Sequence, residues 1–173
     1  MEKHITVPFD RSVSETLVAG DYVYLSGTVY VARDAAHKRM TEALSRGEEL
    51  PFEIKDQTIY YMGPSPAREG HVIGSAGPTT ASRMDKYAPQ LLDLGQTGMI
   101  GKGRRSQAVK DAMEKNKATY FAAVGGAGAL LCKCISSSEV IAYDDLGAEA
   151  IRKITVKDFP VIVVMDCHGG CLY

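Results

Sequence analysis

Residues 21–47 read DYVYLSGTVYVARDAAHKRMTEALSRG, and they contain the clearest change of secondary structure in the chain. The first part, residues 21–32, is rich in β-branched and aromatic residues around Gly27, which predicts a strand with a bulge or two strands in sequence. Residues 34–47 predict a helix, because apolar residues follow with helical spacing at Ala36, Met40, Ala43 and Leu44. A strand that leads into a helix favours an α/β domain.

The rest of the chain extends this pattern. Strand-like runs lie at residues 4–9, 58–63, 97–103, 119–124, 139–143 and 160–166. Helices are predicted at residues 82–95, with a restart at Pro89, and at residues 105–117, whereas residues 63–70 are a loop. A short helix is predicted to begin within residues 125–135, and residues 150–158 are ambiguous between helix and strand. We therefore expect one α/β domain over residues 1–173, with a mixed sheet layered with helices.

Bulk composition limits the classes of function. A chain of 173 residues is the size of one domain that can bury a core without disulfides or metals. The net charge of −1 gives no electrostatic basis for binding nucleic acid or an anionic membrane. The first ten residues carry charges where a signal peptide needs an apolar run, and no run is long enough to span a bilayer. We therefore expect a cytoplasmic protein.

The four cysteines fall in two close pairs, Cys132 with Cys134 and Cys167 with Cys171. In a chain without a secretory signal, thiols are expected rather than disulfides. The spacing matches no common zinc pattern, so we interpret these residues as buried or terminal thiols, with a metal site as the alternative.

The stretch GPTTASR at residues 77–83 has two readings. Pro78 prevents a helix from entering from upstream, and either Thr79 or Thr80 suits the N-cap of the helix that follows. The first amides of such a helix would face an anion, and Arg83 lies one turn after Thr79, where its guanidinium is able to bind a carboxylate. The alternative is an ordinary capped helix with a solvated arginine.

Two further basic residues follow predicted strands. Arg33 lies between a strand and a helix, and His37 is one turn further on the same face; the alternative is an arginine paired with Asp34 and a surface histidine. Lys102 lies between two glycines at the end of another strand, where the alternative is a solvated turn. If Arg33, Arg83 and Lys102 meet, the resulting pocket suits a small molecule with two carboxylates.

Other catalytic patterns are missing from the sequence. GxSxG, which marks a serine hydrolase elbow, does not occur, and neither does HExxH or the phosphate-binding GxxxxGK[ST]. A nucleotide phosphate site at GKGRR, residues 101–105, is therefore a weak alternative.

Three motifs in the same order resemble a known family. They are GTVYVARDAAHKR (27–39), GSAGPTTASRMDKY (74–87) and MIGKG (99–103), and the likeness continues through YFAAVGGAGALL and SEVIAYDDLGAEAIRKITVKDFP. Together they resemble the C-terminal domain of class I, iron–sulfur-dependent fumarate hydratases and the β subunit of two-subunit L-tartrate dehydratases. The resemblance implies a swivelling β/β/α-type domain.

The resemblance also implies a function. Such enzymes add or remove water across a C–C double bond of a dicarboxylate, converting malate to fumarate or L-tartrate to oxaloacetate. It implies that this chain is a β subunit, that an α subunit holds a [4Fe-4S] cluster, and that this chain binds no cofactor. The expected partners are the α subunit and a small dicarboxylate, within a homo-oligomer or heterotetramer.

Site residues follow from the same resemblance. It places the substrate-binding arginines at Arg33 and Arg83, and it places the catalytic threonine and lysine at Thr79 and Lys102. The residues alone do not distinguish Thr79 from Thr80. Two alternatives stay open: a non-catalytic module that binds substrate or regulates a cluster-bearing partner, and a small phosphate binder.

Overall fold

The structure, a computed structural model, describes residues 2–62, 77–124 and 131–173. Its strands are β1 (Glu2–Val7), β2 (Tyr22–Val31), β3 (Thr58–Tyr60), β4 (Gly98–Gly101), β5 (Thr119–Ala123), β6 (Ile135–Ala142) and β7 (Ile151–Met165). Its α-helices are α1 (Arg11–Ser14), α2 (Asp34–Ser45), α3 (Ala88–Asp93) and α4 (Gln107–Asn116). Three 3-10 helices complete the elements of these residues: η1 (Ala81–Met84), η2 (Cys132–Cys134) and η3 (Asp144–Glu149).

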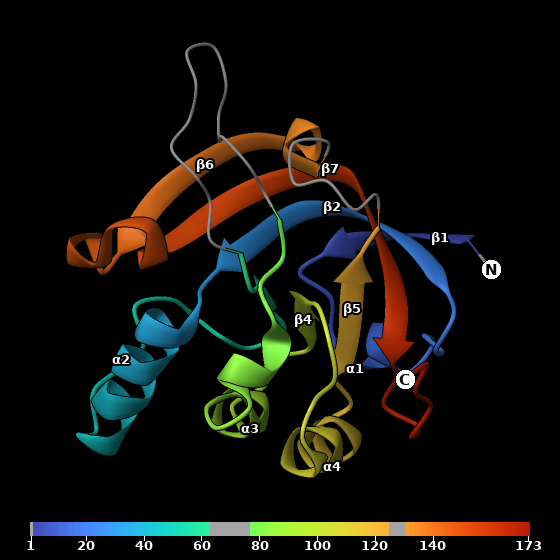
Figure 1. The fold of residues 1–173 in the computed structure, drawn as a ribbon, viewed down its shortest axis with the longest axis horizontal. Coiled ribbons are helices and arrows are strands. Elements are labelled where there is room, and N and C mark those ends of the chain that lie inside the picture. Colours follow the sequence, from blue (N-terminus) through green and yellow to red (C-terminus); the bar gives the residue numbers. More distant parts are fainter. Residues whose placement is uncertain (1, 63–76, 125–130) are drawn as a thin grey trace.

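The predicted mixed sheet is confirmed. Its seven strands have the order β1-β2-β3-β4-β5-β7-β6, with an additional pairing between β2 and β7. The pairs from β1 to β5 are parallel, whereas β7 is antiparallel to β2, β5 and β6. The β2–β7 pairing closes β2, β3, β4, β5 and β7 into a ring. In Figure 1, β2, β6 and β7 arch across the top, and α2, α3 and α4 lie below.

Two hydrophobic cores lie on opposite faces of the parallel strands, because side chains alternate along a strand. Residues of one core face the interior of the ring, including Tyr60, Ile100 and Phe121. The residues immediately before them belong to the other core, which packs against the helices: Ile59, Met99 and Tyr120. Burial on both faces explains why these strands read as continuous apolar runs in the sequence.

The predicted bulge in the first long strand is confirmed at Gly27. The register between β2 and β7 shifts between Leu25 and Gly27, and Gly27 has φ of 128°. A Cβ atom at Gly27 would overlap the carbonyl oxygen of Val7 in β1. Glycine is therefore required here both by its backbone conformation and by the close approach of β1.

The last third of the chain departs most from the sequence prediction. The predicted segments 150–158 and 160–166 fall in one strand, β7, which spans Ile151–Met165 and contains Pro160. Residues 135–142 form β6, which begins earlier than the predicted strand at 139–143. The chain therefore ends its sheet with antiparallel strands, whereas alternating strands and helices were predicted. Long pairing with β2 decides the ambiguous segment, and a single-sequence pattern does not contain that tertiary contact.

Other predicted elements within the described residues keep their type with shorter or shifted bounds. The predicted helix at 82–95 is broken into η1 and α3, with Pro89 in the first turn of α3. The predicted loop at 63–70 and the first part of the predicted helix at 125–135 lie outside the described residues. Within the described residues, no helix is long and apolar enough to cross a membrane.

Candidate functional site

The predicted site residues lie where the parallel strands β2, β3 and β4 end. Arg33 lies two residues after the end of β2 and occupies the N-cap position of α2. Next to it, the backbone amide of Ala32 donates to the carbonyl of Tyr60 at the end of β3, over 3.3 Å. This edge is where α/β sheets bind ligands, because the carboxyl ends of neighbouring parallel strands meet there.

Thr79 lies in a segment that enters between the ends of β3 and β4. The backbone amide of Thr79 donates to the carbonyl of Tyr61 over 2.7 Å, and the amide of Lys102 donates to the carbonyl of Thr79 over 3.3 Å. Pro78 also bridges to Met62, and Thr80 bridges to Lys102. The backbone therefore places Thr79 beside Lys102, at the position where β3 and β4 separate.

Gly101 makes room for this segment. A Cβ atom at Gly101 would lie 2.9 Å from Cδ2 of Tyr61 and 3.1 Å from Cβ of Ala81. The amide of Ala81 donates to the carbonyl of Lys102 over 2.7 Å, so the two segments are in close contact. The glycine before Lys102 is therefore explained by packing.

Arg83 reaches the first turn of α2. Its Nη2 atom lies 2.6 Å from Oδ2 of Asp34, and Nε of Arg33 lies 3.9 Å from Oδ1 of the same carboxylate. The structure thus brings Arg33 and Arg83 together around Asp34, while Thr79 and Lys102 are joined through their backbones. Asp34 and Glu149, whose Oε1 accepts from the amide of Ala35, are the carboxylates that lower the positive charge of this edge.

The helix argument for an anion site at GPTTASR is corrected by the structure. Thr80 occupies the N-cap position of η1, but neither its hydroxyl nor another side chain makes a capping hydrogen bond. The element that follows is the four-residue 3-10 helix η1, which is too short to give a useful macrodipole. Any attraction for an anion here therefore comes from the side chains and not from a helix end.

The helix after Lys102 also begins later than predicted. We expected it over residues 105–117, whereas α4 begins at Gln107. Ser106 is its N-cap, and its hydroxyl accepts a hydrogen bond from the amide of Val109 over 3.3 Å. Residues 103–106 form a connection, which lets Arg105 turn into the protein.

His37 is not on the surface, contrary to the alternative offered for it. Its side chain is fully buried beside the rings of Tyr61 and Tyr87. Nδ1 lies 2.7 Å from the carbonyl oxygen of Arg33, so this nitrogen carries the hydrogen. Burial lowers the pKa of His37 to about 4, against the opposite effect of that hydrogen bond, and the ring is neutral at pH 7. His37 therefore fixes the backbone of Arg33.

Arg105 is a buried residue that sequence reasoning missed. Its side chain is 0% exposed, and its Nε donates to Oδ1 of Asp85 over 2.7 Å. Nη2 donates to the hydroxyl of Tyr61 over 3.3 Å, and the guanidinium lies against the rings of Tyr61 and Tyr120. Asp85 also accepts from the amide of Ser106 over 2.6 Å. This network joins the segments that carry Thr79, Arg83 and Lys102.

Local sequence contains little sign of this network. Asp85 and Arg105 are 20 positions apart and lie on different elements. A charged residue in a polar stretch such as GKGRRSQ is ordinarily assigned to solvent. The sequence does indicate a contact between Asp34 and Arg33, because the two residues are adjacent. The contact of Asp34 with Arg83 depends on the tertiary fold.

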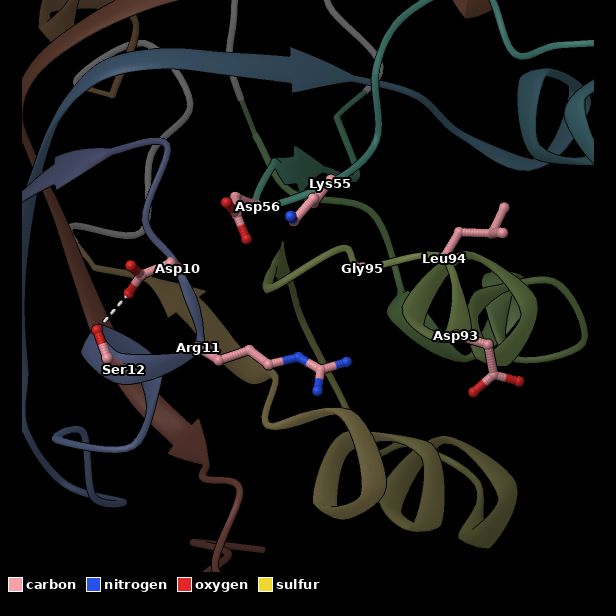
Figure 2. A pocket seen from close by; sticks show the side chains of 8 residues that line it. All are labelled: Asp10, Arg11, Ser12, Lys55, Asp56, Asp93, Leu94 and Gly95. Atoms are coloured by element: carbon pink, nitrogen blue, oxygen red, sulfur yellow. Dashed lines mark hydrogen bonds between the residues drawn. The ribbon is translucent and has the colours of Figure 1, made fainter.

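A cavity of about 560 Å³ opens at the opposite end of the same strands. Lys55 and Asp56 precede β3, and Gly95 precedes β4, so this cavity is at the amino ends. Figure 2 shows positively and negatively charged side chains around it, including Arg11, whose side chain extends from α1 toward α3 and α4. Because these opposite charges are mixed and mostly exposed, the cavity indicates no ligand class.

The four cysteines are thiols. Cys132 and Cys134 pack against the core inside the ring. Cys167 is buried, and its Sγ contacts the carbonyl of Ser14 over 3.9 Å. Burial raises the pKa of the Cys167 and Cys134 thiols. Within residues 2–62, 77–124 and 131–173, no three His, Cys, Asp or Glu side chains gather as metal ligands.

The fold and this edge define an α/β domain in which arginine, lysine and threonine residues gather at the carboxyl ends of parallel strands. The family model described as Fumarase C-terminus matches residues 3–173. The chain therefore belongs to the fumarase C-terminal family.

Related proteins of two kinds match the chain. A Salmonella typhimurium protein named fumarate hydratase class I, aerobic, is 47% identical over 174 residues, which cover 96% of this chain and 30% of that protein. Fumarate hydratase 2 of Leishmania major is 42% identical over 156 residues, which cover 89% of this chain and 28% of that protein. A Methanocaldococcus jannaschii protein, provisionally named L(+)-tartrate dehydratase subunit beta, is 36% identical and covers 91% of this chain and 84% of its own length.

The chain thus spans about 30% of the length of the Salmonella fumarate hydratase. Its length is closer to that of the Methanocaldococcus jannaschii protein, of which it covers 84%. The names of these relatives describe hydro-lyases, and they connect the family to the addition and removal of water.

Proposed function

We propose that this chain is the β subunit of a two-subunit iron–sulfur hydro-lyase and that it binds a hydroxy-dicarboxylate. The observation that carries the proposal is the group of Arg33, Arg83, Lys102 and Thr79 at the carboxyl ends of β2, β3 and β4. Within the described part of the chain, Nε of Arg33 is buried with no hydrogen-bond partner. A buried donor without a partner fits a site that is completed by an anionic ligand.

Malate and fumarate are the first choice of substrate, because the Salmonella and Leishmania relatives are named fumarate hydratases. L-tartrate is the second, because the relative of similar length has a tartrate dehydratase name. The β-subunit assignment is supported by the 84% coverage of that protein, whose name implies an α subunit. We include in the proposal assembly as a heterotetramer or another oligomer.

A [4Fe-4S] cluster does not fit the described residues of this chain, since they bring no three metal-ligating side chains together. We therefore assign the cluster to the α subunit, where it would supply Lewis-acid chemistry. The part of this chain is to bind, orient and deprotonate the substrate.

The two arginines bind and orient the substrate in this proposal. Arg33 and Arg83 each bind a carboxylate, which converts binding energy into orientation of the reacting carbons. In dehydration, the C–H bond next to one carboxylate breaks, its electrons form the C–C double bond, and the C–O bond on the neighbouring carbon breaks. The hydroxide that leaves takes up a proton from solvent and becomes water. Negative charge develops toward the carboxylate as the proton leaves, and the cations at this edge stabilise it.

Thr79 receives that proton. A threonine hydroxyl is a weak base, so it must first lose its own proton to solvent, and nearby positive charge stabilises the alkoxide that accepts the substrate proton. The backbone contact between Thr79 and Lys102 places a lysine in the adjacent segment. Lys102 is thus the residue that we assign to activating Thr79 and to stabilising the developing charge.

The test is to mix this chain anaerobically with its cluster-bearing partner and to measure dehydration of malate and of L-tartrate separately. Each component alone is the control. We expect turnover of one substrate in the mixture only. An inactive mixture with an intact cluster and a formed complex would contradict the proposal and favour a non-catalytic binding subunit, whereas turnover by this chain alone would contradict the assignment of the cluster to the partner.

A further inference from the structure

Asp34 lies between the two arginines of the proposed substrate site. Its Oδ2 is 2.6 Å from Nη2 of Arg83, and its Oδ1 is 3.9 Å from Nε of Arg33. The side chains of Arg33, Asp34 and Arg83 are 21%, 29% and 52% exposed. The pair with Arg83 is therefore at the edge of solvent, while the side toward Arg33 is more enclosed.

The backbone of Asp34 is held firmly from both sides. The carbonyl of Arg33 accepts two hydrogen bonds from His37, one from its backbone amide over 2.9 Å and one from its buried ring over 2.7 Å. The amide of Ala35 donates to Oε1 of Glu149 over 3.2 Å. The carboxylate thus extends from a fixed helix start, whereas Arg83 comes from a four-residue 3-10 helix and has the more exposed side chain.

Two arginines in one site repel each other, and this repulsion grows where water is excluded. A carboxylate between them offsets the repulsion and also fixes the direction of the guanidinium that it binds. It reduces the positive charge of the group as well, together with Glu149, which accepts a hydrogen bond from the amide of Ala35.

We propose that Asp34 is a positioning residue that holds Arg83 beside Arg33 and lowers the positive charge of the site. This inference rests on the proposed function, because it concerns the same binding edge. A guanidinium has five N–H donors, and the contact with Asp34 uses Nη2, so other donors of Arg83 stay available for substrate.

An alternative role for Asp34, as a group that competes with substrate for Arg83, predicts the opposite change in dicarboxylate binding. If the carboxylate only occupied Arg83 until substrate displaced it, removal of the carboxylate would tighten the binding of dicarboxylates. If Asp34 positions Arg83, removal weakens their binding and makes a more highly charged anion relatively better. The sign of the change therefore distinguishes the two roles.

The experiment compares Asp34→Asn and Asp34→Ala with the unmodified chain, each in complex with the cluster-bearing partner. Asp145→Asn is the matched control. Asp145 forms a similarly short ion pair, at 2.7 Å, with Arg39, which lies on α2 as Asp34 does, and this pair is on the exposed surface. The measurements are KM, kcat and the inhibition constants of two unreactive probes, the dicarboxylate succinate and the tricarboxylate tricarballylate.

We expect Asp34→Asn to raise KM and the succinate inhibition constant about tenfold or more, with a smaller change in kcat. The preference for succinate over tricarballylate should fall about tenfold, because the site gains one positive charge. Asp145→Asn should leave all of these values within about twofold. An unchanged preference, or tighter succinate binding, in both Asp34 variants would overturn the inference.

A second measurement does not depend on turnover. In the full chain, nitrogen NMR of the arginine side chains reports whether the Arg83 guanidinium is held by a carboxylate. We expect its signal to shift in Asp34→Asn and to stay in Asp145→Asn. An unmoved Arg83 signal would refute the positioning role even in an active enzyme. A shifted signal together with a changed anion preference in an inactive complex would retain the role of Asp34 and refute only the hydro-lyase function.

Discussion

At the scale of single residues, the site is a set of side chains fixed through their backbones. Thr79 and Thr80 are adjacent and chemically alike, yet they make different contacts: Thr79 exchanges backbone hydrogen bonds with Tyr61 and Lys102, whereas Thr80 is exposed. Because the two threonines are adjacent and chemically alike, alanine variants of Thr79 and Thr80 form a matched pair that tests which hydroxyl takes part in the reaction.

We expect Thr79→Ala to lower kcat of the complex about 100-fold or more, because loss of a general base removes a factor of that order. Thr80→Ala should stay within about twofold, since its hydroxyl makes no capping hydrogen bond to η1. Steady-state kinetics with malate and L-tartrate provide the measurement. Equal losses in the two variants would assign the effect to the backbone of the segment instead of the Thr79 hydroxyl.

His37 provides a prediction about stability and pH. Burial lowers its pKa from 6.5 to about 4 in the folded chain, so between these values the unfolded chain binds more protons than the folded one. The free energy of unfolding therefore falls as the pH drops from 6.5 to 4, by a contribution on the order of 3 kcal/mol. Asp34 and Arg105 act on this ring with opposite signs, and neither reverses the effect of burial.

The measurement is urea unfolding at several pH values, with His37→Asn as the comparison. The asparagine amide is able to donate to the carbonyl of Arg33, as Nδ1 of His37 does, but it does not titrate. We expect a flatter dependence between pH 6.5 and 4 in this variant. The same slope in both proteins would show that His37 does not carry the effect.

At the scale of elements, β4 has a glycine at each end, and different neighbouring residues exclude a side chain at the two positions. A Cβ at Gly98 would overlap the hydroxyl of Thr58 at the amino end, whereas a Cβ at Gly101 would press on Tyr61 and Ala81 at the carboxyl end. Both changes add one methyl group to a buried strand, but only the second one disturbs the segment that carries Thr79.

We expect Gly98→Ala and Gly101→Ala each to lower the free energy of unfolding by about 1–3 kcal/mol, the usual cost of overpacking. Activity of the complex, measured well below either melting temperature, should fall at least about tenfold more in Gly101→Ala. Thermal unfolding and kinetics on the same samples separate the two effects. If both variants lose activity in proportion to stability, Gly101 has no special role in placing Thr79.

The elements predictable from sequence are those that depend on local pattern. The strand and helix of residues 21–47, the amphipathic α4 and the break near Pro89 follow from spacing and from proline chemistry. β7 was ambiguous because its length comes from pairing with β2, more than a hundred residues earlier. The ion pair of Arg83 with Asp34 and the burial of Arg105 likewise depend on contacts between distant segments.

At the scale of the whole molecule, membership in the fumarase C-terminal family agrees with a domain whose candidate chemistry is confined to one edge. The basic and hydroxyl residues follow β2, β3 and β4, and the mixed-charge cavity lies at the other ends of β3 and β4. A partner that completes the proposed enzyme would therefore be expected to cover the carboxyl-end edge.

The closed ring of strands has a consequence for how the chain is made. β2 spans residues 22–31, and the strand that closes the ring against it, β7, spans residues 151–165. A ribosome that has released β2 to β5 has therefore produced two open sheet edges, on β2 and on β5, that only the last strand satisfies. Contacts over such long separations form slowly, and unpaired edges invite pairing with other chains. A chain that is still being synthesised is thus most prone to misassembly in the interval before β7 emerges.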